Sequence, residues 1–147
     1  MLSISLFISL MKILIPYEKV DTSHYVILRY HPGDNYYTNF PEGAKPAELT
    51  SREVDDMEGI LVKAIHTYNA KALDISSVRK LEKYWRQYIP FINSSGQKEV
   101  WINFICQPAP VWKQEVVRIL DGGNCFFNVK INLVTRKVYD LFVEGDP

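Results

Sequence analysis

Residues 49–68, LTSREVDDMEGILVKAIHTY, carry the strongest local signal in the chain. Thr50 and Glu53 match a capping box, in which the threonine hydroxyl accepts from the amide three residues on and the glutamate reaches back. Leu49 and Val54 have the spacing of a hydrophobic staple. Apolar residues then repeat every three or four positions, which predicts a helix with one buried side. The predicted buried stripe is Val54, Met57, Leu61, Ile65 and Tyr68, and the predicted wet side is Arg52, Asp55, Asp56, Glu58 and Lys63.

The segments around this helix have the pattern of β-strands joined by short connections. Asn93-Ser94-Ser95-Gly96 is a turn of hairpin length, and Asp121-Gly122 is a strong hairpin signal between two β-rich runs. Residues 40–48 contain two prolines and a glycine, which predicts a surface loop. A short helical turn is expected within residues 74–86. The predicted strands are 12–17, 25–30, 84–92, 98–106, 115–120, 125–133 and 138–143.

One long helix followed by strands with tight turns predicts an α+β fold, in which the helix packs on a curved antiparallel sheet of four to five strands. The domain prediction is an apolar N-terminal segment over residues 1–11 and a single α+β domain over residues 12–147. Period-two alternation sorts strand residues onto two faces. We expect the helix-facing side to hold Val100, Ile102, Phe104, Cys106, Val117, Ile119, Cys125, Phe127, Val129, Ile131, Leu133, Tyr139, Leu141 and Val143. We expect the open side to hold Tyr84, Arg86, Tyr88, Trp101, Asn103, Arg118, Phe126, Asn128, Lys130, Asn132, Asp140 and Phe142.

Charge and composition restrict the function classes. The 147 residues include 17 Lys plus Arg and 17 Asp plus Glu, so the formal net charge is zero. Nucleic-acid binding relies on an excess of cations, so we expect no nucleic-acid partner. Residues 1–16 hold about ten apolar positions before Lys12, short of the roughly 20 that a membrane-spanning helix needs. As a secretory signal the segment has no preceding cation and no small-x-small cleavage site, which leaves cytoplasmic and exported locations open, and translation could start at Met11.

The order of a helix and a curved sheet resembles the cystatin-like and NTF2-like architectures. The resemblance is to small bacterial proteins and covers roughly the C-terminal two thirds. It is carried by residues 86–88, Gly96, residues 100–103 and 121–123, Phe127 and Val129. It implies the two-layer fold, but a fold of this kind hosts many functions. The Gln-x-Val-x-Gly inhibitory loop of true cystatins is absent from the sequence, so protease inhibition is not implied.

Catalytic and metal-binding motifs are missing from the sequence. His24, His31 and His66 fall in no recognisable motif, and GxSxG, HExxH, CxxC and P-loop spacings do not occur. We therefore predict no metal site and no cofactor. In a simple meander Cys106 and Cys125 would lie on the order of 15 Å apart at opposite sheet ends, whereas a disulfide needs Cα atoms within about 7 Å. The expectation is two free thiols.

The open sheet face gives the main functional hypothesis, because Tyr, Trp and Arg dominate binding hot spots. It predicts a non-catalytic interaction module that binds a protein partner or forms a homodimer. The predicted binding residues are Arg86, Tyr88, Trp101, Asn103, Arg118, Asn128 and Lys130. The alternative is an NTF2-like pocket in the curved sheet that binds or converts a small molecule, with Asp140 as general base among Tyr84, Tyr88 and Asn128. A third alternative is that cross-strand pairs on this face only stabilise the sheet.

Overall fold

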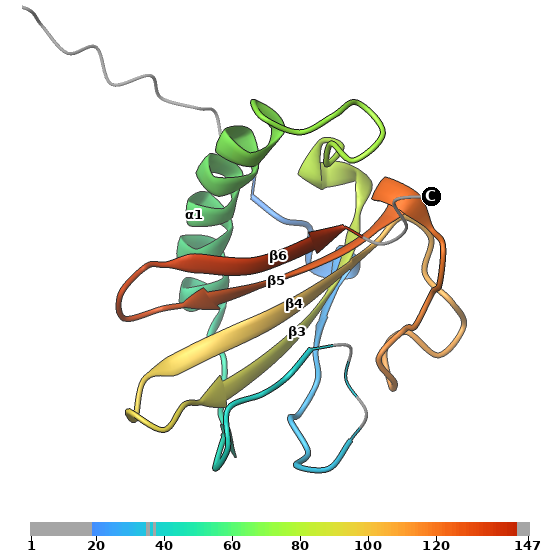
Figure 1. The fold of residues 1–147 in the computed structure, drawn as a ribbon. Coiled ribbons are helices and arrows are strands. Elements are labelled where there is room, and N and C mark those ends of the chain that lie inside the picture. Colours follow the sequence, from blue (N-terminus) through green and yellow to red (C-terminus); the bar gives the residue numbers. More distant parts are fainter. Residues whose placement is uncertain (1–18, 35, 37, 144–147) are drawn as a thin grey trace, which may run out of the picture.

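The computed structural model describes residues 19–34, 36 and 38–143. One helix, α1 (Ser51–Asn69), packs on one side of a mixed sheet (Figure 1). The strands are β1 (Tyr25–Ile27), β2 (Lys45–Pro46), β3 (Trp85–Ile92), β4 (Lys98–Ile105), β5 (Phe126–Asn132) and β6 (Val138–Val143). This confirms the α+β fold class. The sheet has six strands rather than four or five, and β1 runs parallel to β3, so it is not purely antiparallel.

Helix α1 begins where the sequence predicts. The Thr50 hydroxyl accepts from the Glu53 amide at 3.2 Å, and the Glu53 carboxylate accepts from the Thr50 amide at 2.8 Å, which completes the capping box. These two bonds satisfy donors that a helix start leaves without partners. The predicted buried stripe is confirmed for its first four members, and Tyr68 is half-buried. Glu58, expected on the wet side, is 1% exposed, so that expectation is wrong.

The sheet order is β1-β3-β4-β5-β6, with β2 paired to the far end of β3. The hairpin of β3 and β4 has the predicted boundaries within one residue at each end. Residues 115–120 form no strand, which contradicts the prediction, so β4 and β5 are direct neighbours. The Asp121-Gly122 hairpin is also wrong. This pair leads instead into a 3₁₀ turn over Gly123–Cys125.

Adjacency of β4 and β5 corrects the expectation about the cysteines. Ile105 lies opposite Phe126 in the register, so the next pair outward is Cys106 and Cys125. The Cys106 amide donates to the Cys125 carbonyl at 3.0 Å, and the two Cα atoms are 5.0 Å apart. The two side chains form a disulfide rather than free thiols. The predicted separation of about 15 Å assumed an intervening strand that does not exist.

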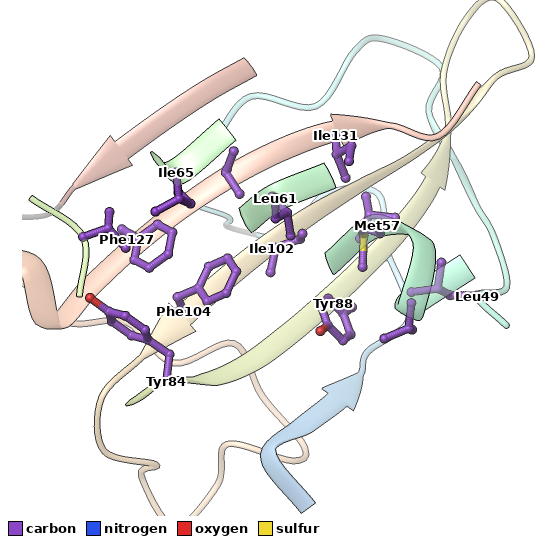
Figure 2. Packing of buried hydrophobic residues seen from close by; sticks show 14 residues of the cluster. Leu49, Met57, Leu61, Ile65, Tyr84, Tyr88, Ile102, Phe104, Phe127 and Ile131 are labelled. Carbon is purple, nitrogen blue, oxygen red and sulfur yellow. The ribbon is translucent and has the colours of Figure 1, made fainter. Parts of the chain in front are cut away.

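The main core lies between α1 and the sheet (Figure 2). Met57 and Leu61 of the helix are fully buried, as are Ile102 and Phe104 of β4. The rings of Phe104 and Phe127 stack at 4.2 Å between centroids. Burial on this scale is the main favourable term in folding, because it removes apolar surface from water.

The opposite face of the sheet is not open. We call it the covered face, because two loops lie over it. Residues 28–44 contribute Tyr30 and Phe40, which pack on Trp101 and Phe91. Residues 107–122 contribute a second cluster on the same side of the sheet, made of Trp112, Val117 and Ile119 against Ile105, Trp85 and Phe126. Val117 and Ile119 were expected to face the helix, so their placement is a correction.

A bulge in β6 shifts its alternation. Lys130 lies opposite Tyr139, and Asn128 lies opposite Phe142. Two residues of β6, Asp140 and Leu141, therefore occupy the position opposite a single residue of β5, Val129. Asp140 adopts a φ of 50°, the left-handed conformation that one class of bulge requires. Tyr139 therefore lies on the covered face, where its hydroxyl donates to Glu99 at 2.8 Å, rather than toward the helix. The bulge separates it from Leu141 and Val143, which pack on the main core as expected.

The predicted strand over 12–17 and the N-terminal segment over 1–11 lie outside the described residues. Within the described part of the chain, no helix has the length and apolar character needed to cross a membrane.

Candidate functional site

The predicted binding residues do not form one exposed surface. Arg86 and Tyr88 lie opposite Phe104 and Ile102, so they face α1 and not the covered face. Both are buried, with exposures of 3% and 0%. The phase of β3 could not be read from its sequence, because both of its sides are buried and both therefore contain large residues.

Four other predicted residues do lie on the covered face, but beneath its loops. Trp101, fully buried, donates from its indole nitrogen to Asn128 at 3.3 Å. The Asn103 amide donates to Gln87 at 3.0 Å and to the Val117 carbonyl at 2.9 Å. An interface through Trp101 and Asn103 would therefore require the loops to move away from the sheet.

Gln87 explains how the 107–122 loop is held there. Its side-chain nitrogen donates to the carbonyls of Trp112 and Glu115 at 2.6 and 2.7 Å, and its oxygen accepts from the Val117 amide at 2.9 Å. These bonds satisfy the loop backbone without strand pairing. Arg118, the remaining predicted residue on this side, is exposed on the same loop.

Asp140 does not join the residues proposed to assist it. Its side chain is 58% exposed and forms an ion pair with Lys130 at 3.1 Å. Lys130 is itself buried on the covered face and also donates to the Asn39 carbonyl at 2.6 Å. Tyr84 and Tyr88 belong to the core on the other side of the sheet. The structure therefore does not bring the proposed acid–base set together.

A pocket of about 850 Å3 opens on one flank of α1. We call it the α1–β3 pocket. It lies between the C-terminal half of α1, residues 78–82 and residues 19–24. Its apolar lining consists of Val20, Val62, Ile65, Val78 and Leu81. Its volume is in the range of ordinary small-molecule sites, which measure about 300–1,000 Å3.

The floor of this pocket is a buried ion pair. Arg86 and Glu58 are among its most buried lining residues, with side-chain exposures of 4% and 1%. The Arg86 guanidinium donates to both carboxylate oxygens of Glu58, from Nε at 3.1 Å and from a terminal nitrogen at 3.3 Å. The Tyr88 hydroxyl donates to the same carboxylate. Burial of two charges is tolerated only where such pairing offsets the loss of hydration.

Only some of the N–H groups of Arg86 donate hydrogen bonds to described residues. A guanidinium carries five N–H groups. Two of them bond to Glu58 and a third donates to the Tyr84 carbonyl at 2.6 Å. The other two have no acceptor among the residues that the structure describes. A buried N–H without a partner is unfavourable by about 1–3 kcal/mol, so an acceptor supplied from the pocket would be bound favourably.

A second hollow of about 670 Å3 lies on the other flank of α1. We call it the α1–β6 groove. Its apolar lining consists of Ile60, Ala64, Tyr68, Val138 and Leu141, and its remaining lining residues are Lys63, Thr67, Lys71 and Arg136. Asp140 lines neither this groove nor the α1–β3 pocket.

Neither hollow was predicted from the sequence. One available signal was the spacing of Glu58, which follows Val54 by four residues and precedes Leu61 by three, as members of a buried stripe do. A buried glutamate is unfavourable unless a cation pairs with it, and Arg86 on β3 is that cation. No sequence pattern indicates that residues 19–24 and 78–82 meet beside α1.

Comparison of the chain with protein-family models, with curated proteins and with solved structures finds no match.

Proposed function

We propose that this protein is a non-catalytic binding protein that holds a small aliphatic carboxylic acid in the α1–β3 pocket. The observation that carries the proposal is Arg86, a buried cation on the pocket floor with two N–H groups that lack acceptors among the described residues. A carboxylate accepts two parallel N–H bonds from a guanidinium, which makes it a well-matched group for this position.

The walls support an aliphatic body for the ligand. Val20, Ile65 and Val78 are buried, whereas Val62 and Leu81 keep part of their surface exposed. Covering that surface would contribute roughly 25 cal/mol per Å2. The lining also has four Lys or Arg residues against three Asp or Glu residues, which mildly favours an anion. Its described lining contains no Ser, Thr or Cys, so it offers no side-chain thiol or aliphatic hydroxyl as a nucleophile.

The test is calorimetric titration with octanoate, with octylamine as the matched cation. We expect octanoate to bind and octylamine not to bind, because only octanoate can accept from Arg86. Val62→Trp should fill the pocket and weaken octanoate binding by about tenfold or more, a loss of roughly 1.4 kcal/mol. Ile60→Trp, on the other flank of α1, is the control and should leave octanoate binding unchanged. Equal binding of octanoate and octylamine, or full octanoate binding by Val62→Trp, would contradict the proposal.

A further inference from the structure

The α1–β6 groove lies where the sheet ends. Within the described residues β6 pairs with β5 on one side and with no strand on the other. In the view of Figure 1 the C-terminal half of α1 extends past β6. The groove lies between this part of the helix and β6, and its lining includes Ile60, Ala64 and Tyr68 of α1 with Val138 and Leu141 of β6.

The apolar residues of the groove are incompletely packed. Ile60 and Tyr68 of α1 are half-buried, as are Val138 and Leu141 of β6. They border the main core, so a chain laid along β6 would extend that core. A free strand edge also offers unpaired N–H and C=O groups to such a chain. Domains that bind peptides between a helix and an edge strand use this combination of backbone bonding and side-chain burial.

The charged residues around the groove all have one sign. Its lining includes Lys63, Lys71 and Arg136 and no Asp or Glu. Arg136 is matched by Asp56 at 2.7 Å. The ammonium groups of Lys63 and Lys71 have no acceptor among the residues that the structure describes. Lys63 lies one turn before Thr67 on α1, and Lys71 lies two residues after the end of the helix at Asn69, and both line the groove.

We propose that the α1–β6 groove binds an extended acidic segment of a partner protein, which adds to the edge of β6 as a strand. Its apolar side chains would cover Ile60, Ala64 and Tyr68, and its acidic side chains would face Lys63 and Lys71. The bulge at Asp140 interrupts the edge, so the backbone ladder would be short and the side chains would supply much of the affinity.

A second copy of the chain fits this surface less well. Two-fold pairing of β6 with β6 would bring the same patch of each copy together. Lys63 and Lys71 of one copy would then approach those of the other, and like charges disfavour that contact. An acidic segment has the complementary charge.

The test uses a short fluorescein-labelled peptide of alternating glutamate and valine, followed by fluorescence anisotropy on the full chain. We expect it to bind, and the same peptide with lysine in place of glutamate not to bind. The double variant Lys63→Glu/Lys71→Glu should bind the acidic peptide about tenfold more weakly, since each surface ion pair contributes up to about 1 kcal/mol. Lys45→Glu/Lys83→Glu is the matched control, because both of those lysines are exposed and lie outside the groove.

Two further peptides test strand addition without altering the protein. In one the valine nitrogens are methylated, and in the other the glutamate nitrogens are methylated, so each blocks one edge of the peptide. We expect one of the two to lose binding. If both bind like the unmodified peptide, or if Lys63→Glu/Lys71→Glu binds as well as the wild type, the proposal is wrong. A dimer in light scattering that Ala64→Asp dissociates would also overturn it, because the groove would then belong to a second copy.

Discussion

Arg86 combines two roles at the scale of a single residue. It neutralises Glu58 inside the core, and two of its N–H groups, at the floor of the α1–β3 pocket, have no acceptor in the part of the chain that the structure describes. A buried ion pair is weak evidence of stabilisation, because well-packed apolar residues of similar volume often do as well. Stability alone therefore does not account for a charged floor.

The energetic role of the pair can be measured by urea unfolding. Arg86→Met alone should lower the free energy of unfolding by about 3–5 kcal/mol, because it leaves the Glu58 carboxylate buried without its cation. The triple variant Glu58→Leu/Arg86→Met/Tyr88→Phe removes the whole polar cluster and should recover most of that loss. If the triple variant is as unstable as Arg86→Met, the pair stabilises the fold beyond what apolar packing provides.

Helix α1 is the element that organises both hollows, and its start is coupled to the sheet through Glu53. This carboxylate accepts from the Thr50 amide, and it pairs with Lys98 of β4 at 2.7 Å. Partial burial raises the pKa of Glu53, but hydrogen bonds from Lys98 and Thr50 outweigh that effect. The net pKa lies below the ordinary value of 4.5.

This shift predicts how stability responds to acid. A carboxyl whose pKa is lower in the folded chain stabilises it above its unfolded pKa, and the contribution is lost as pH falls through the folded value. Urea unfolding midpoints of Glu53→Gln should therefore fall less than those of the wild type as the pH drops from neutral to below 4.5. Glutamine can still accept from the Thr50 amide, so the capping box is preserved. Glu42→Gln, at an exposed position, should follow the wild type. Identical acid profiles for Glu53→Gln and the wild type would contradict the assignment.

The elements that the sequence predicts well are those whose signals are local. Thr50 and Glu53 are three residues apart, and the turn from Asn93 to Gly96 joins strands that pair with each other. The prediction failed where the local structure of a segment depends on a residue far away in the sequence. Residues 115–120 have a β-rich pattern. The Gln87 side chain, however, hydrogen-bonds the Glu115 carbonyl and the Val117 amide, and the segment forms a loop. The same limit applies to both hollows, because their walls come from segments that meet only in the folded chain.

At the scale of the whole molecule, both faces of the sheet are covered, and this separates the two hollows. The α1–β3 pocket lies by β3 and the α1–β6 groove by β6, on opposite flanks of one helix. Their lining residues do not overlap, so variants in one can serve as controls for the other. Ile60→Trp should disturb the peptide groove while octanoate binding persists, and Val62→Trp should do the reverse.

The disulfide joins the end of β4 to the start of β5. Cys106 and Cys125 are 19 residues apart, and they enclose the loop that covers the sheet. Arg79 also donates to the Cys106 sulfur at 3.6 Å and to the Asn124 side chain at 3.1 Å, so the segment that bounds the α1–β3 pocket is tied to the same corner. A crosslink over a loop of this size restricts the unfolded chain and stabilises the fold by about 3 kcal/mol.

Reduction should therefore lower the free energy of unfolding by about 3 kcal/mol, measured by urea titration with and without dithiothreitol. Cys106→Ala/Cys125→Ala should match the reduced wild type and should not respond to dithiothreitol, which controls for other effects of the reductant. Thiol titration of the unfolded, unreduced protein, after equilibration in an oxidising glutathione buffer, should find no free thiol. Free thiols there would show that the bond does not form.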